Sequence, residues 1–207
     1  MSTATLAAPR RRTLLLLLGA LFLLPLGLAF LLYYGFDWRP SGQTNHGSLI
    51  RPARPLPPLL LPQFIATQSA PGAQEVMSAP TVLQGKWSLL YIGDGDCDAA
   101  CRQALYFMRQ TYLGLGNQTS RLQRVFLVTA HCCDANYLAR EQPGLIVLRA
   151  DAPQAAPLLA QFPDDQRAAT LFIIDPLGNL MMRYDTHDRP RGLHDDMKQL
   201  LGLSHIG

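Results

Sequence analysis

Four cysteines are the residues of this sequence with the most distinctive chemistry, and they fall in two close pairs. Cys97 and Cys101 form a CxxxC pattern, whereas Cys132 and Cys133 are adjacent and follow His131. Two thiols at CxxxC spacing suit reversible disulfide exchange or the binding of a thiophilic ion such as Cu(I). Because CxxxC is less specific than CxxC, a structural disulfide or two buried thiols is the alternative.

Each cysteine pair is expected just after a buried strand. The apolar runs Trp87–Gly93 and Arg124–Thr129 predict two such strands, and the apolar stripe of Asp98–Tyr112 predicts a helix between them. Functional sites collect at the carboxyl ends of strands in open α/β sheets, so the two pairs are expected on one rim. The amides at the start of the helix favour a thiolate at Cys97 or Cys101, and the nearby aspartates oppose it.

The sequence His131-Cys132-Cys133 offers an imidazole and two thiols in three successive residues. This set suits a metal or a relay of disulfide exchange, and the alternative is one inward-packed cysteine with an incidental neighbour. We expect Cys97 and Cys101 to form a reversible disulfide. We expect Cys132 and Cys133 not to bond to each other, because the ring they would close departs from ordinary disulfide geometry.

The remaining apolar patterns complete an α/β domain that we place at residues 81–207. Its other expected elements are strands at Leu145–Leu148, Thr170–Ile174 and Leu180–Tyr184, a hairpin turn at Asp175–Asn179, and helices at Pro157–Phe162 and Leu193–Leu201. Alternation of strands and helices followed by a hairpin predicts a mixed sheet with helices on both faces.

A long apolar segment precedes this domain. Residues 14–34 contain no charged side chain and, as a helix, would reach roughly 31 Å, the thickness of a bilayer core. Arg10, Arg11 and Arg12 come before it and a cluster of aromatic residues follows, which predicts a cytoplasmic tail at 1–13 and a translocated domain. A cleaved signal peptide fits less well, because its apolar stretch is usually about 7–15 residues long.

Prolines punctuate the segment 35–80, most densely between Pro52 and Pro62, and we expect the segment to be a semi-rigid tether between the membrane and the domain. The alternative is that Leu56–Phe64 packs along the domain as an edge segment.

The 18 basic and 15 acidic side chains leave a net charge of +3, too weak and too dispersed for nucleic-acid binding.

Two segments of the chain resemble the SCO/SenC family. They are the run GKWSLLYIG at 85–93 with Cys97-x3-Cys101-x3-Leu105 after it, and the run FIIDPLGNL at 172–180. The layout of one anchor, a tether and a domain is also similar. The resemblance implies a thioredoxin-like fold in a membrane-anchored protein that helps to load copper into cytochrome c oxidase.

The resemblance also implies ligands, and here the sequence departs from the family. The family holds copper with the two cysteines of CxxxC, matched by Cys97 and Cys101, and with a histidine whose position falls on Arg167. A guanidinium has no lone pair to give to a metal. In addition, Arg102 replaces a usual proline, and His131 with its two cysteines replaces an acidic motif. His131 would be a third ligand if its loop reaches the CxxxC.

The sequence therefore favours a membrane-anchored thioredoxin-like accessory protein for cytochrome c oxidase assembly, acting by thiol–disulfide exchange. Cys97 would be the attacking thiol and Cys101 the resolving thiol. The alternatives are a non-catalytic Cu(I) carrier with Cys97, Cys101 and His131 as ligands, or a degenerate scaffold that only binds partners. The expected partners are the membrane and an oxidase subunit or assembly factor. The expected location is a bacterial-type inner membrane, crossed once, with the domain on the periplasmic side.

Overall fold

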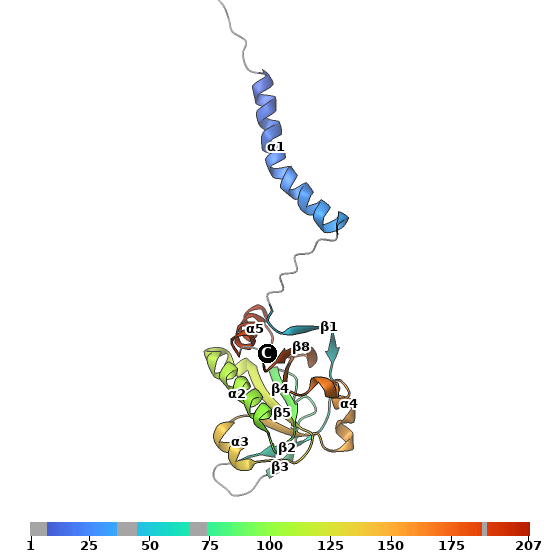
Figure 1. The fold of residues 1–207 in the computed structure, drawn as a ribbon, viewed down its shortest axis with the longest axis vertical. Helices are drawn as coiled ribbons and strands as arrows, with labels where there is room; N and C mark the ends of the chain where they lie inside the picture. Colours follow the sequence, from blue (N-terminus) through green and yellow to red (C-terminus); the bar gives the residue numbers. More distant parts are fainter. Residues whose placement is uncertain (1–7, 37–44, 67–73, 188–189) are drawn as a thin grey trace, which may run out of the picture. The chain divides into compact units, whose positions relative to one another are not determined.

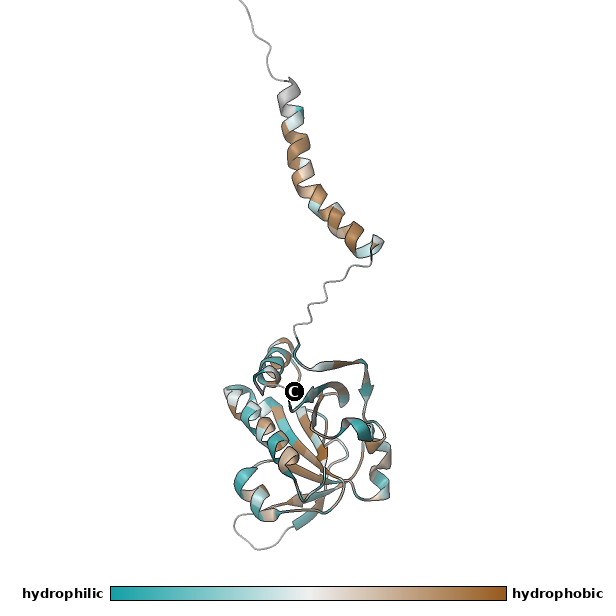
Figure 2. Ribbon diagram, in the orientation of Figure 1, coloured by the Kyte–Doolittle hydropathy of each residue, from teal (hydrophilic) through white to brown (hydrophobic). Residues whose placement is uncertain are grey.

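Two compact units divide the chain, one at Met1–Thr44 and the other at Asn45–Gly207. The computed structural model describes residues 8–36, 45–66, 74–187 and 190–207 (Figure 1). The first unit is helix α1 (Ala8–Phe30), which continues as a π-helical turn at Leu31–Gly35. By length and composition, Arg12–Gly35 is apolar enough to cross a membrane, and hydrophobic residues run along most of this helix (Figure 2). The predicted N-terminal apolar helix is confirmed.

The second unit is, within the described residues, a mixed sheet of eight strands in the order β1-β8-β7-β4-β5-β6-β2-β3 (Figure 1). The strands are β1 (Ser48–Pro55), β2 (Pro62–Ile65), β3 (Gln74–Met77), β4 (Trp87–Gly93), β5 (Leu122–Val128), β6 (Ile146–Arg149), β7 (Thr170–Ile174) and β8 (Asn179–Asp185). The neighbours β4, β5 and β6 are parallel, and the other neighbouring pairs are antiparallel.

Helices cover both faces of this sheet. They are α2 (Ala99–Gly114), α3 (Ala135–Glu141), α4 (Ala156–Leu159) and α5 (Pro190–Leu203). Along β4, Leu89 and Tyr91 join a core with α2, α3 and α5, whereas Leu90 and Ile92 join a second core with α4. Successive side chains of a strand point to opposite faces, and because both faces of β4 are buried, its sequence is apolar apart from Ser88. The predicted α/β architecture, a thioredoxin-like mixed sheet flanked by helices, is confirmed.

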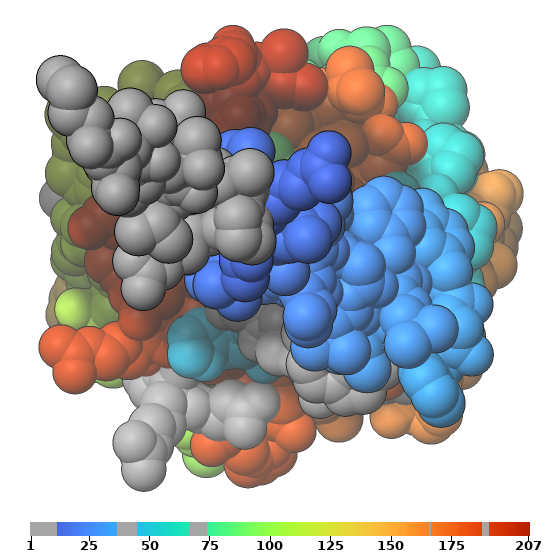
Figure 3. Space-filling model, turned by 90° about the horizontal axis from the view of Figure 1, so that it is seen from above, coloured from blue at the N-terminus to red at the C-terminus, as the bar shows by residue number. Residues whose placement is uncertain are grey.

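The domain begins earlier than residue 81, the boundary expected from the sequence. Three strands come from the segment expected to be a tether: β1 pairs with β8, and β2 pairs with both β6 and β3. In the space-filling view, cyan residues near position 50 lie on the surface of the domain beside orange residues that come much later in the chain (Figure 3). The prolines are tolerated because these strands lie at the margins of the sheet. The alternative placement of Leu56–Phe64 as an edge segment describes part of this arrangement.

Asp196 of α5 fixes the start of the domain. Its carboxylate is 3% exposed and accepts hydrogen bonds from the backbone N–H groups of His46 (2.9 Å) and Gly47 (2.8 Å). A buried carboxylate needs such partners to offset its lost hydration. The chain is therefore held against α5 immediately before β1.

Candidate functional site

The site lies where β4 and β5 end side by side. These strands are parallel and in register from Trp87 opposite Leu122 to Gly93 opposite Val128. The loop that leaves β4 carries Cys97, and the loop that leaves β5 carries Cys132 and Cys133. Both cysteine pairs thus lie at one rim of the sheet, as their positions after two buried strands predict.

Cys97 and Cys101 are joined by a disulfide across the beginning of α2, with their Cα atoms 5.0 Å apart. Asp98 is the N-cap of the helix, and its carboxylate accepts the N–H of Cys101 at 2.9 Å. The guanidinium of Arg102 donates to the carbonyl oxygen of Cys97 at 3.1 Å. Both cysteines are thus held by local contacts of the first helical turn. Whether the disulfide is reversible remains a prediction.

An open cavity of about 490 Å³ adjoins this buried pair, and it is lined by Cys97, Cys101, Tyr91 and Arg167 together with several aspartates. Tyr91 was expected only as part of a buried strand. Burial, and secondarily the charge of Asp98, raises the pKa of Tyr91 to about 12. Its hydroxyl group, neutral at physiological pH even at the ordinary pKa of 10, thus stays neutral to a still higher pH. A phenol at the end of the strand that precedes CxxxC is the sequence signal that would have identified it.

Arg167 lines this cavity, where the resemblance puts a histidine, but its guanidinium is engaged elsewhere. It donates to the carbonyl oxygens of Phe162 (2.7 Å) and Leu159 (2.8 Å), and it forms an ion pair with Asp164. These contacts tie the chain before β7 to the end of α4. No histidine is among the described residues that line the cavity.

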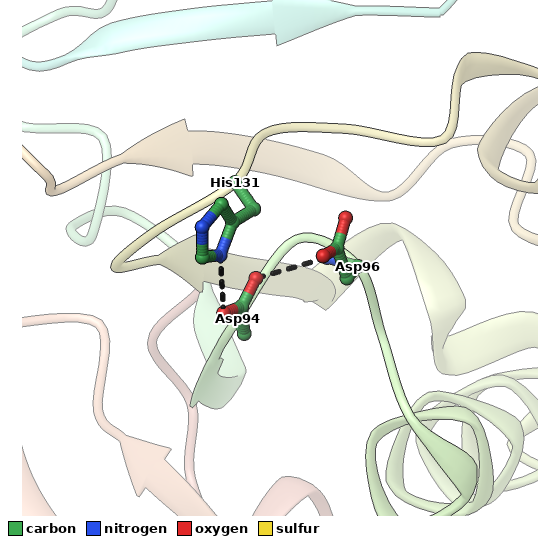
Figure 4. Close-up of side chains that lie close together, drawn as sticks. All are labelled: Asp94, Asp96 and His131. Atoms are coloured by element: carbon green, nitrogen blue, oxygen red, sulfur yellow. Dashed lines mark hydrogen bonds and ion pairs between the residues drawn. The ribbon is translucent and has the colours of Figure 1, made fainter.

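The loop of His131 reaches the CxxxC loop, but its imidazole does not line the cavity. The N–H of Gly95 donates to the carbonyl oxygen of Ala130 at 2.8 Å, and His131 Nδ1 lies 2.8 Å from Asp94 Oδ2 (Figure 4). This hydrogen bond is the main cause that raises the pKa of His131 and lowers the pKa of Asp94. The carboxylate of Asp96 lies beside them, with the potential ligand atoms of all three within 4.8 Å of one another.

Cys132 and Cys133 are bonded to each other, which corrects the expectation that they are not. The peptide bond between them is cis. A cis peptide bond brings adjacent Cα atoms closer than a trans bond does, and here they are 3.1 Å apart. Both side chains can then meet on one side of the chain, a geometry that the sequence does not reveal.

Left-handed backbone also concentrates here. The non-glycine residues with positive φ in the described parts of the chain are Cys97 (45°), His131 (45°) and Ala169 (53°). Cys97 lines the cavity, Ala169 follows the lining residue Ala168, and His131 lies on the adjoining loop. Such conformations are uncommon for residues with a side chain and gather at functional sites. Two of the three, His131 and Ala169, mark this rim as the candidate site independently of the cysteines.

Comparison with known proteins agrees with the fold. Residues 87–204 match the family model described as the transmembrane-like, thioredoxin-like C-terminal domain. A search of curated protein sequences gave no match. Among similar solved structures, yeast Sco1 with copper bound has a TM-score of 0.53 and 17% identity, covering 72% of this chain and 95% of that one. Arabidopsis thaliana ScoI with copper bound has a TM-score of 0.51 and 15% identity, covering 69% of this chain and 98% of that one. At these identities the likeness shows a common thioredoxin-like fold.

Proposed function

The chain belongs to the family of transmembrane-like, thioredoxin-like C-terminal domains, and on that premise we propose that it is a membrane-anchored thiol–disulfide exchange protein that assists assembly of cytochrome c oxidase. The single observation that carries the exchange chemistry is the placement of Cys97 and Cys101. Their side chains are close enough to bond, they lie at the start of α2, and they line one open cavity. The link to the oxidase is supported by the resemblance to SCO/SenC proteins and by the common fold.

The proposed reaction reduces a disulfide of the partner protein. The Cys97 thiolate attacks one partner sulfur, a mixed disulfide forms, and the other partner sulfur leaves as a thiolate. The Cys101 thiolate then attacks Sγ of Cys97, which closes the intramolecular disulfide and releases the first partner sulfur. Two electrons pass to the partner, and the protons of Cys97 and Cys101 end on its two thiols. The amides of the first turn of α2 favour the thiolates on which both steps depend.

A resident copper ion fits the same cavity poorly. Two sulfurs are present, but the third position is occupied by Arg167, which has no lone pair and is bonded to two carbonyl oxygens and a carboxylate. The imidazole of His131 is not among the lining side chains, and it is hydrogen-bonded to Asp94, which does line the cavity. The residues do not supply a three-ligand Cu(I) site, so no step of the proposed reaction uses copper.

Redox titration of the purified full-length chain in detergent tests the exchange function. After equilibration in glutathione buffers and rapid alkylation, the tryptic peptide from Trp87 to Arg102 reports both cysteines. We expect a midpoint in the range of catalytic dithiols, about −270 to −120 mV. The Cys101→Ser variant should instead accumulate a glutathione adduct on Cys97. Structural disulfides have reduction potentials below about −300 mV. A potential in that range for Cys97–Cys101 would contradict the exchange function and favour a scaffold that only binds partners.

The Cu(I) affinity of the reduced chain distinguishes a thiol–disulfide exchange protein from a Cu(I) carrier. Arg167→His supplies an imidazole to the cavity and should raise the Cu(I) affinity of the reduced chain at least about tenfold, the lower end of what even outer-shell changes cost at metal sites. Arg167→Gln is the matched control, because it also loses the guanidinium contacts but adds no imidazole. Competition with a Cu(I) chelator gives the affinities. Tight binding by the unmodified chain that is lost in His131→Ala would favour the carrier.

A further inference from the structure

The cysteine pair on the β5 loop has no part in the exchange just described. We propose that Cys132 and Cys133 form a second redox pair, which exchanges disulfides with Cys97–Cys101 and serves as the port through which folded partners react. This inference rests on the proposed exchange function of Cys97 and Cys101; for a folded partner, it places Cys132–Cys133 between the partner and Cys97, and direct attack by Cys97 is left to small disulfides that enter the cavity.

Backbone contact between the two loops carries the first step of the inference. The Gly95 N–H binds the Ala130 carbonyl oxygen at 2.8 Å, and a Cβ on Gly95 would collide with the carbonyl group of His131 and come within 2.8 Å of the Cys132 Cα. Only glycine permits this approach. Cys97 follows Gly95 by two positions, so the close contact brings Cys132 beside the CxxxC loop.

Arg102 adds a second bridge between the two cysteine segments. Its Nε donates to the carbonyl oxygen of Cys97, and its guanidinium lies over the ring of Tyr137, 5.0 Å from the centroid. Tyr137 belongs to α3, whose N-cap Asp134 directly follows Cys133. A cation–π interaction is a contact that arginine makes well and that an uncharged proline cannot make. Arg102 therefore holds the start of α2 against the start of α3.

The two pairs differ in exposure in the way that a relay requires. Cys97 is 4% exposed and Cys101 is 2% exposed, so a folded partner has access to them only through the cavity. Cys132 and Cys133 are half-buried and pack against the same apolar cluster that contains Cys97 and Cys101. Cys132–Cys133, the outer pair, is thus partly open to solvent and otherwise packed against the cluster that holds Cys97–Cys101, the inner pair.

The relay balances without an added reagent. With Cys97–Cys101 reduced and Cys132–Cys133 oxidised, the Cys97 thiolate attacks Sγ of Cys132, a Cys97–Cys132 bond forms, and Cys133 leaves as a thiolate. Cys101 then attacks Sγ of Cys97 and releases Cys132. The inner pair loses two electrons and two protons, and the outer pair gains them. The reduced outer pair then reduces the partner, and the reverse sequence runs when the partner is a dithiol.

Trapping the intermediate tests the relay. In the full-length Cys101→Ser/Cys133→Ser variant only Cys97 and Cys132 remain, and they lie in separate tryptic peptides, Trp87–Arg102 and Val125–Arg140. Mild oxidation at high dilution should link these peptides within one chain in most molecules. In the matched Cys97→Ser/Cys133→Ser control the yield should fall at least tenfold, because Cys101 is fixed in the helix. Absence of the link, or equal yields, overturns the relay.

A kinetic measurement keeps the proposal testable if those variants fold poorly. Oxidised thioredoxin, a folded disulfide, should oxidise the inner pair of the Cys132→Ser/Cys133→Ser chain at least tenfold more slowly than that of the unmodified chain. Oxidised dithiothreitol, which can enter the cavity, should react with both at rates within twofold. Equal rates with thioredoxin overturn the relay. Failure of the exchange function looks different, because Cys97–Cys101 of the unmodified chain would then not respond to glutathione buffers.

Discussion

Asp98 acts on the dithiol in two opposing ways. As the N-cap of α2 it accepts the N–H of Cys101 and so stabilises the turn that holds both cysteines. As an anion beside the cavity it disfavours a thiolate, and its charge contributes to the raised pKa of Tyr91. The two effects can be separated, because asparagine caps a helix about as well as aspartate does and carries no charge.

Substitution of Asp98 should therefore have two distinct outcomes. Asp98→Ala should lower the free energy of unfolding by about 1 kcal/mol, through loss of the cap. Asp98→Asn should preserve that free energy within a few tenths of a kcal/mol and speed alkylation of the reduced cysteines, since a repelling charge is gone. Denaturant unfolding and timed alkylation of the Trp87–Arg102 peptide measure the two quantities. Equal destabilisation by both substitutions would contradict the capping role.

The ion pair of His131 and Asp94 predicts a pH dependence at the same rim. Because the pKa of His131 is raised, its stabilising contribution is present below its ordinary pKa of 6.5 and is lost as pH rises through the folded value. Because the pKa of Asp94 is lowered, its contribution is present above its ordinary value of 3.8 and is lost as pH falls through the folded value. The ion pair is thus complete at mildly acidic pH, and it is lost at higher pH, where His131 loses its proton.

Asp94→Asn should move the pKa of His131 down toward 6.5, measured by NMR titration of its imidazole. Asp96→Asn is the matched control, since Asp96 acts on His131 only through its charge and should shift the pKa less. An unchanged His131 pKa in Asp94→Asn would show that the hydrogen bond does not form in solution.

Among the elements, β1, β2 and β3 are part of the folded domain and do not act as a tether between it and the membrane. Leu56, Leu61 and Phe64 come from this segment and are buried, with exposed fractions between 1% and 7%. Burying a large apolar side chain contributes roughly 1.5–3 kcal/mol, so the three together approach the whole stability of a typical domain, about 5–15 kcal/mol. Without β1 and β2, the edges of β8 and β6 would also lose their hydrogen-bonding partners.

A chain that starts at Thr81 should for this reason fail to fold cooperatively, whereas one that starts at Asn45 should fold. Circular dichroism and denaturant titration of the two soluble pieces measure this difference. The longer piece is the matched control, because it retains β1 and the buried Asp196 contact. Equal unfolding midpoints for the two pieces would show that residues 45–80 do not stabilise the domain and act only as a tether.

The elements that sequence patterns locate well are those whose signal is local. Trp87–Gly93 has the expected bounds because a strand buried on both faces leaves an apolar run, which here is interrupted only by Ser88. The turn before β8 is also local, since Asp175 accepts the N–H groups of Leu177 and Asn179, and Gly178 has a φ of 87°. β1 gave no such signal, because a mostly exposed edge strand that contains arginine and proline has the composition of a tether.

The features of the candidate site also fall into those that local sequence predicts and those that it does not. Strand order places both cysteine pairs on one rim, and counting along the chain places Arg167 near them. The bonds from Arg167 to the carbonyl oxygens of Phe162 and Leu159, and the ion pair of His131 with Asp94, depend on how loops pack together. No periodicity in the sequence encodes that packing.

At the scale of the molecule, the orientation of α1 decides whether the proposed chemistry has a suitable compartment. Disulfides persist in oxidising compartments and are rare in the cytoplasm. Arg10, Arg11 and Arg12 precede the apolar helix. On the far side Arg51 and Arg54 belong to β1 of the folded domain, which leaves Arg39 as the arginine of the short connecting segment. Positive charge near the span is therefore concentrated before it, and this favours a cytoplasmic N-terminus.

The domain should accordingly lie outside the cytoplasm. Alkaline phosphatase, which needs export for activity, should be active when fused after Gly207, and a reporter that works only in the cytoplasm should be inactive there. Changing Arg10, Arg11 and Arg12 together to glutamine is the matched control: it keeps the apolar span but removes the charge bias, so phosphatase activity should fall as part of the chains insert in the opposite sense. Activity of the cytoplasmic reporter on the unmodified chain would overturn the orientation. It would also place the four cysteines in a reducing compartment, where stable disulfides at either pair lose their physical basis.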